Sequence, residues 1–316
     1  MNDRIAYMIT AYVSPESLAN LIRALSGDSS DFYVHIDKKA DITPFIRATD
    51  GLKNVYFLSD ERRVKVFWGG YSQVMMQYNL IRTILESGIR YGRIVSLTGM
   101  DYPVASNAVL KEAFSDQGKE YIIGFNITME NWSPSSSISM SCKDRFLYYY
   151  RFDGNWNLAR VIKKLRIRRF KTYESLGYCF YYGSEYWALT YDCISDLMAA
   201  YDSDTRLREI FRHSFVPSES WIHTLFFNSG YKDRGVAWKG NFDLGVGNYA
   251  HLTYFNYGKK IKILDEDDYE MIISSGKPFA RKLENGISDN LRLRLERYRE
   301  RDSSTQQDFR YYLSLL

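Results

Sequence analysis

With 316 residues, the chain is long enough for one large domain or two ordinary ones. Its composition, 45% hydrophobic and 25% charged, is close to the average of globular proteins and predicts a full buried core. The net charge of +4 does not by itself indicate a nucleic-acid partner, although it suits an anionic ligand. The cysteines are three in number and form no CxxC pair, so neither a disulfide framework nor a zinc site is predicted.

The sequence predicts no targeting or membrane-spanning segment. The N-terminus, MNDRIAYMITAYV, carries charges at once and only a short apolar stretch, which is unlike a signal peptide. No uncharged apolar run approaches the length of a membrane span. Together with the unpaired cysteines, these features predict a protein that is kept in the reducing cytoplasm.

The first half of the chain alternates strand and helix patterns. Strands are predicted at 4–13, 31–37, 54–58, 64–68 and 93–97. Helices are predicted at 18–25 and 71–87. This alternation indicates an α/β domain with a mainly parallel sheet flanked by helices, in which ligands bind beyond the carboxyl ends of the strands.

Four polar side chains fall at these predicted strand ends. His35 and Asp37 close the strand at 31–37, and Asp101 and Tyr102 follow the strand at 93–97. Because the carboxyl ends of parallel strands share one edge of a sheet, these residues are candidates for binding a nucleotide or a sugar.

The second half is less regular. Residues 178–190 have a strand pattern and 191–201 a helical one, and a further helix is predicted from Pro217 to Gly230. Glu219 stands at the mouth of that helix, ahead of an apolar run. An acid in a first helical turn offsets the helix dipole by about 0.3–1 kcal/mol. The alternative is that Glu219 has a catalytic role.

The rest of the chain contains one more strand and a helical end. A strand is predicted at 234–238, and a loop-rich stretch follows it to about residue 262. The terminus has the pattern of a helix, a linker and a short amphipathic helix. We therefore expect one domain over 1–284 and a helical tail over 285–316.

Motifs that define several other enzyme classes are absent. There is no GxGxxG, GxxxxGK[ST], GxSxG or HExxH, which argues against dinucleotide, P-loop, serine-hydrolase and metal-hydrolase sites. Asp-rich spots at 28–31, 202–204 and 265–267 are interpreted as surface loops, because none follows a buried strand as the Asp-x-Asp metal motif of sugar-nucleotide enzymes does. At the place for that motif, after 93–97, the chain has the single acid Asp101.

Eight segments occur in the order in which they are found in one enzyme family. They are AYMITAY, YVHIDKKAD, VFWGGYSQV, SLTGMDYPV, YYGSEYWALT, VPSESWIHTLFFNS, RGVAW and PFARKLE. In these segments, which extend from about residue 4 to 284, the chain resembles the core-2/I-branching β-1,6-N-acetylglucosaminyltransferases, a family shared with the peptide xylosyltransferases. The resemblance implies a GT-A-like α/β fold, inverting transfer from a UDP-sugar, and no metal or other cofactor.

The resemblance also assigns roles to individual residues. It implies that Glu219 is the general base and that Arg234 and Lys282 bind the donor diphosphate, with Arg281 as a neighbour that can be confused with Lys282. The chemistry agrees, because single displacement needs one carboxylate to take the proton of the acceptor hydroxyl. Without a metal, fixed cations must stabilise the charge on the leaving UDP.

Acceptor-binding residues are expected in two places. The resemblance implies roles for Lys143 and Arg145, and Trp187 is expected either to stack on a sugar or to lie in the core. Family members often have Gln where Glu185 stands and His where Tyr12 stands. Donor or acceptor choice is therefore expected to differ in this chain.

The stretch 159–171 contains seven basic residues and no acid. It is interpreted as a solvated helix face or as a contact with an anionic lipid or a pyrophosphate-linked glycan. We expect a bacterial-type transferase that moves GlcNAc, or alternatively xylose, to a surface polysaccharide at the inner face of the membrane, with no nucleic-acid partner. The alternatives are a metal-dependent sugar-nucleotide transferase and a non-catalytic RNA- or glycan-binding protein, the latter resting on 159–171 beside FLYYYRF.

Overall fold

The computed structural model describes residues 4–127, 144–154, 156–169, 176–238, 250–256 and 260–301. Its centre is a five-stranded sheet in the order β3-β2-β1-β4-β8. The strands are β1 (Ile5–Ala11), β2 (Ser30–Ile36), β3 (Val55–Phe57), β4 (Arg93–Thr98) and β8 (Ala188–Thr190). The first four are parallel and β8 is antiparallel, which confirms the predicted α/β class and mainly parallel sheet.

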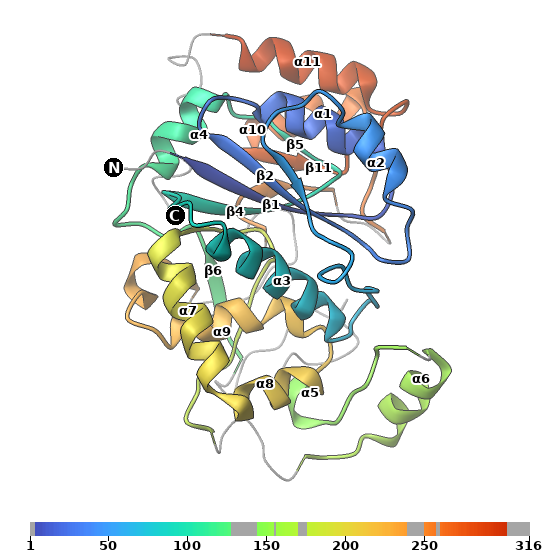
Figure 1. The fold of residues 1–316 in the computed structure, drawn as a ribbon, viewed down its shortest axis with the longest axis vertical. Coiled ribbons are helices and arrows are strands. Elements are labelled where there is room, and N and C mark those ends of the chain that lie inside the picture. Colours follow the sequence, from blue (N-terminus) through green and yellow to red (C-terminus); the bar gives the residue numbers. More distant parts are fainter. Residues whose placement is uncertain are drawn as a thin grey trace.

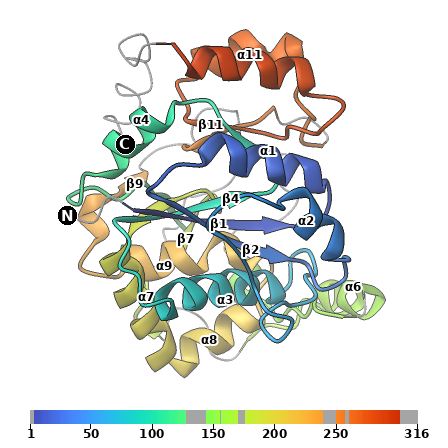
Figure 2. The same ribbon diagram turned by 45° about the horizontal axis from the view of Figure 1, so that its top comes forward.

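Helices cover both faces of this sheet (Figures 1 and 2). One face packs against α1 (Pro15–Leu25), α2 (Thr43–Ala48), α4 (Asn107–Phe114), α10 (Tyr269–Ser274) and α11 (Asp289–Arg299). The other face packs against α3 (Ser72–Glu86), α7 (Tyr191–Ser203), α8 (Thr205–Arg212) and α9 (Trp221–Phe227). In α1, the apolar residues predicted to face inward, Leu18, Leu21, Ile22 and Leu25, are all buried.

Two small sheets adjoin the central one. The first has the order β10-β11-β5 and comprises β10 (Thr253–Tyr254), β11 (Phe279–Arg281) and β5 (Asp101–Pro103). The second has the order β7-β6-β9 and comprises β7 (Tyr181–Tyr182), β6 (Ile123–Asn126) and β9 (Val236–Trp238). Because β5 begins three residues after β4 ends, the first small sheet lies beyond the carboxyl end of β4.

Two predicted strands differ in the structure. Residues 64–68 form no strand; they are an irregular segment that is held by hydrogen bonds from Val64 N to His35 and from Val66 N to Asp37. The strand pattern at 178–190 splits into β7 and β8, which belong to different sheets. Gly183 follows β7, and a side chain at this position would collide with His223 and with the Ile123 carbonyl.

The described part of the predicted tail packs onto the domain. In α11, Leu291, Leu295 and Tyr298 are buried in the same cluster as the β1 side chains, and the Tyr102 hydroxyl donates to Glu296 (3.0 Å). The final predicted helix falls at 302–316, outside the described residues. None of the helices in the described part of the chain has the length and apolar content that crossing a bilayer demands.

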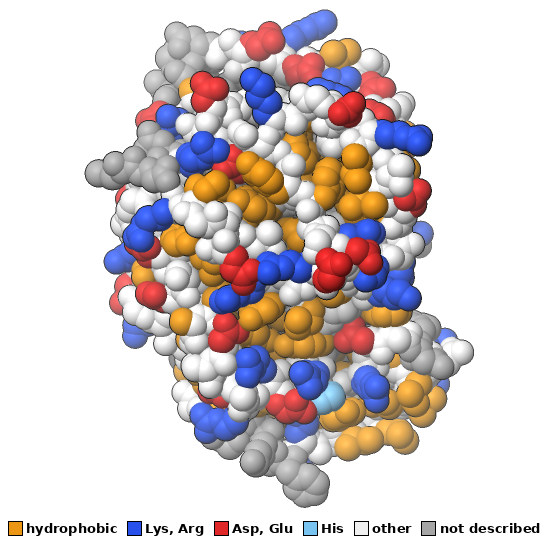
Figure 3. Space-filling model, viewed as in Figure 1, with side chains coloured by type: hydrophobic (Ala, Val, Ile, Leu, Met, Phe, Trp, Pro, Cys, Tyr) orange, Lys and Arg blue, Asp and Glu red, His pale blue; other side chains and the backbone are white. Residues whose placement is uncertain are grey.

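Two short helices, α5 (Asp144–Leu147) and α6 (Trp156–Leu165), lie at the end of the molecule away from α11 (Figure 1). In the space-filling view, apolar side chains gather at the lower right, over α6 (Figure 3). The side chain of Ala159 packs α6 onto a small separate cluster with Tyr150, Phe152 and Phe215.

Candidate active site

Glu219 lies in a short turn where several elements meet. Val216 enters the turn with a φ of 48°, Pro217–Glu219 form one turn of 3₁₀ helix, and α9 begins at Trp221. Glu219 thus precedes α9 rather than lying within its first turn as predicted. Its carbonyl accepts a hydrogen bond from Gly183 N (2.8 Å), and its side chain is 24% exposed, so the carboxylate reaches solvent from a backbone that is firmly held.

Arg145 holds the Glu219 carboxylate. Its Nη1 donates to Glu219 Oε2 (2.8 Å), while the guanidinium lies over the rings of Tyr182 (4.8 Å) and Phe215 (5.7 Å). Arg145 is almost fully buried, and the ion pair fixes the orientation of the carboxylate. The structure therefore places Arg145 behind the acid, instead of on an open acceptor surface. Lys143 lies outside the described residues.

A second carboxyl group, Glu185, lies close to the first. Burial raises the pKa of Glu185 to about 7, and the negative charge of Glu219 adds to this rise. The side chains of Ser218, Arg281 and Gln77 oppose it. The Oε1 atom of Glu185 is buried and accepts no hydrogen bond from any described residue. Near neutral pH, much of Glu185 therefore carries a proton, and it then offers one donor and one acceptor as a glutamine does.

Arg281, whose charge acts on Glu185, is followed in the chain by a second cation, Lys282. In the antiparallel pairing of β11 with β5, Arg281 faces Asp101, and its Nε lies 3.6 Å from Asp101 Oδ1. The Arg281 guanidinium also lies over the Tyr186 ring (5.4 Å). Burial lowers the pKa of Lys282, and the charge of Arg281 lowers it further. Two adjacent cations, one of them partly desolvated, form a favourable place for an anion.

Asp101 is bonded by the protein on both oxygens. Its carboxylate accepts hydrogen bonds from Thr98 N (2.7 Å) and Thr98 Oγ1 (2.9 Å), and it forms the ion pair with Arg281. Burial raises the pKa of Asp101, and these partners act in the opposite direction. Asp101 thus positions Arg281 and the turn after β4, and its buried side chain is not open to a ligand.

Arg234 lies near the amino-terminal end of β4, whereas Lys282 lies near the other end of that strand. The Nη1 of Arg234 donates to the Gln117 carbonyl (3.5 Å), and Gln117 in turn donates to the carbonyl of Gly92, directly before β4. Lys282 lies beyond the carboxyl end of β4, next to the partner of Asp101. The six residues of β4 span roughly 20 Å. The structure therefore does not bring Arg234 and Lys282 together about one diphosphate, as the sequence predicts, because the sheet separates them.

Four further residues that the sequence marks as site candidates are buried. His35 is fully buried, its Nε2 accepts from Val64 N (3.0 Å), and burial lowers its pKa to about 4. Asp37 accepts from the backbone of Lys39 and of Val66, so it also orders the 64–68 segment. Tyr102 is buried against α11, and Trp187 is buried in the core. These side chains support the carboxyl edge of the sheet from within.

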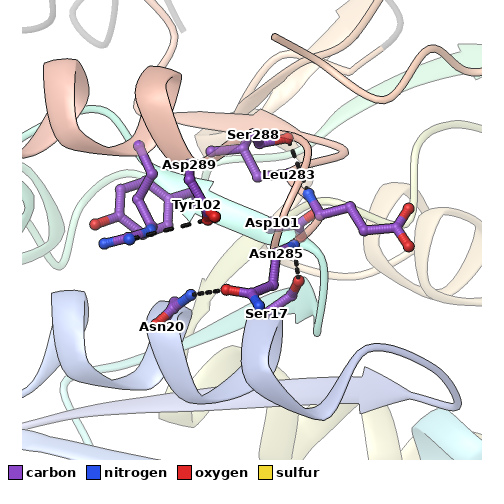
Figure 4. Close-up of a pocket in the computed structure, with 10 residues that line it drawn as sticks. Ser17, Asn20, Asp101, Tyr102, Leu283, Asn285, Ser288 and Asp289 are labelled. Atoms are coloured by element: carbon purple, nitrogen blue, oxygen red, sulfur yellow. Dashed lines mark hydrogen bonds and ion pairs between the residues drawn. The ribbon is translucent and has the colours of Figure 1, made fainter.

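A small pocket opens beside Asp101 and Tyr102, between α1 and the segment after β11 (Figure 4). Ser17 and Asn20 line it from α1, and Asn285 lines it from the opposite side. Its volume of about 10 Å³ has room for about one water molecule. The pocket is too small for a sugar nucleotide and does not extend the site.

Trp68 is a residue that the sequence did not single out. The residue is 64% exposed, and its ring meets the Phe215 ring edge-on at 5.6 Å between centres. Val216 N donates to the Gly69 carbonyl (2.9 Å), which ties this segment to the turn that carries Glu219. An exposed indole can stack on a sugar ring. The signal in the sequence was a tryptophan directly before two glycines.

Comparisons with known proteins agree on one family. A family model described as "Branch: Core-2/I-Branching enzyme" matches residues 5–244. Human xylosyltransferase 2 is 25% identical over 236 residues, which are 72% of this chain and 25% of that protein. The human N-acetyllactosaminide β-1,6-N-acetylglucosaminyl-transferase is 23% identical over 306 residues, covering 89% of this chain and 68% of the relative. The chain thus spans about a quarter of the length of the xylosyltransferase that it matches.

Among solved structures, the glycosyltransferase GlyE of Streptococcus pneumoniae aligns with 98% of this chain and 64% of its own. The TM-score of that alignment is 0.33 and the sequence identity is 9%.

Proposed function

The chain belongs to the core-2/I-branching enzyme family, and we propose that it is a glycosyltransferase that moves a sugar from a UDP donor to a glycan acceptor with inversion at the anomeric carbon. The relatives are named for xylose and for N-acetylglucosamine transfer, which supports GlcNAc as the donor sugar, with xylose as the alternative. We propose a surface polysaccharide as the acceptor.

The observation that carries this proposal is that the charges of Glu219 and Arg281 both act on Glu185, with Lys282 next to Arg281 in the chain. Glu219, held by Arg145, takes the proton of an acceptor hydroxyl while the hydroxyl oxygen bonds to the anomeric carbon. The bond from the anomeric carbon to the phosphate oxygen breaks, and its electrons leave with UDP. Lys282, with Arg281 beside it, stabilises the charge on the diphosphate.

We also propose that this chemistry needs no metal. Asp101 is the single acid at the place where sugar-nucleotide enzymes carry Asp-x-Asp. Its two oxygens are already bonded to Thr98, and it pairs with Arg281. A carboxylate engaged in this way has little capacity left for a cation, whereas Arg281 and Lys282 provide fixed positive charge at the same edge of the sheet.

Replacing Glu219 by Gln tests the role of the base. The amide still accepts a hydrogen bond from Arg145 but takes no proton, so UDP release in the presence of acceptor is expected to fall by about a hundredfold or more. UDP affinity, measured by calorimetry, is expected to stay within about twofold of the wild-type value, since Arg281 and Lys282 are unchanged. Glu112→Gln, an exposed change on α4, is the matched control.

The same variant can contradict the proposal. A protein with Gln at position 219 that turns over at the rate of the Glu112→Gln control would show that Glu219 is only a partner for Arg145. A melting temperature lowered with activity intact would point to the same structural role, because the change leaves the charge of Arg145 uncompensated.

A further inference from the structure

The helix α6 carries an apolar stripe on its outer face. Leu158, Val161 and Leu165 are 50%, 53% and 63% exposed, and their spacing of three and four places them on one side of the helix. Ile167 follows at the end of the helix and is exposed as well. Large apolar residues that cluster outside the core mark a surface that binds something.

Basic side chains surround this stripe. Arg160, Lys164, Arg166 and Arg168 are all exposed, and no acid occurs from 156 to 169. Arg166 is held in place by Asp144 (3.3 Å) and by the ring of Tyr148. Figure 3 shows Lys and Arg side chains beside the apolar group at this end of the molecule. The face therefore combines exposed apolar surface with positive charge.

The inner side of α6 is anchored next to the proposed base. Ala159 is buried with Phe215 and Val216, and Lys163 Nζ lies 4.7 Å from the centre of the Phe215 ring. Phe215 and Val216 directly precede the turn that ends at Glu219. A surface that contacts the outer side of α6 would thus lie close to the site.

We propose that the outer face of α6 binds the surface of an anionic lipid bilayer. Charge alone would suit any polyanion, and an apolar stripe alone would suit another protein. An apolar stripe flanked by Lys and Arg on one short helix matches the interface of a membrane, where apolar side chains enter the acyl boundary and cations meet anionic headgroups. Bound in this way, the protein holds the Glu219 turn near acceptors carried on lipid.

The test is sedimentation of the full chain with vesicles of phosphatidylcholine, with and without phosphatidylglycerol. Binding is expected only with the anionic lipid and is expected to weaken at high salt, since exposed charges are screened over about 8 Å at physiological ionic strength. The triple variant Leu158→Ser, Val161→Ser, Leu165→Ser is expected to bind at least about tenfold more weakly. The control changes Met271, Ile287 and Leu293 to Ser; these are 44% to 60% exposed at the other end of the molecule and should bind as wild type does.

All six side chains are exposed, so both triple variants are expected to fold. The UDP affinity of each variant tests its folding independently of membrane binding. The proposal is overturned if the anionic vesicles leave the wild type in solution or if neutral vesicles bind it equally. A control variant that loses binding as strongly as the α6 variant also overturns it. The proposal is likewise overturned if light scattering shows that the wild type is a dimer and that the α6 variant is a monomer. RNA binding that matches vesicle binding and survives the triple variant would assign the face to nucleic acid.

Discussion

Replacing Glu185 by Gln should stabilise the protein in a way that depends on pH. The pKa of Glu185 is raised to about 7 in the folded chain from an ordinary value of 4.5. Between these two values the folded state keeps a proton that the unfolded chain has lost. The free energy of unfolding of the wild type therefore falls as pH rises through this window and levels off above about pH 7.

The size of the effect follows from the same two pKa values. At about 1.36 kcal/mol per pKa unit, the difference between 4.5 and about 7 corresponds to about 3 kcal/mol. This is an upper limit, because Glu185 keeps part of its surface in solvent. Gln has the shape and hydrogen bonding of the protonated acid and does not titrate. The free energy of unfolding of the Glu185→Gln variant therefore does not fall with pH in this way.

Urea unfolding from about pH 5 to about pH 9 measures the effect in wild type and in Glu185→Gln. The stability of the variant relative to wild type should rise across the window and be constant above it. Glu112→Gln, an exposed change, should run parallel to wild type throughout. A difference that does not change with pH, or that is largest at acid pH, would refute the argument that Glu185 is protonated by burial.

The remaining predictions concern the cations and the buried ion pair. Lys282→Ala should weaken UDP binding about tenfold or more, whereas Arg234→Ala should leave it unchanged in the same calorimetric titration, because Arg234 lies near the other end of β4. EDTA should leave the UDP release of wild type intact; activity lost in EDTA and restored by Mn²⁺ would support the metal-dependent alternative. Glu120→Ala should destabilise the fold by about 3 kcal/mol in urea, since it leaves Arg93 buried with only carbonyl partners, and a change under about 1 kcal/mol would contradict this.

The sequence alone determined the central sheet. Strands buried on both faces are rich in apolar residues over a short stretch, so β1, β2 and β4 could be recognised without knowledge of their neighbours. It also placed Glu219 at the start of a buried helix, because proline and serine mark that start locally, although α9 itself begins only at Trp221. The strand predicted at 64–68 does not form, since a short apolar run does not show that a partner strand exists.

Only the tertiary structure decided which side chains share a site. Arg145 and Glu219 are separated by 74 positions in the chain, and their ion pair depends on how α5 meets the turn before α9. Arg234 and Lys282 both suit a diphosphate by chemistry, yet β4 lies between them. His35 falls at a strand end by count, but its side chain points into the protein. Local patterns fix the type of each element, whereas distances between distant residues depend on topology and side-chain direction, which the chain acquires only by packing.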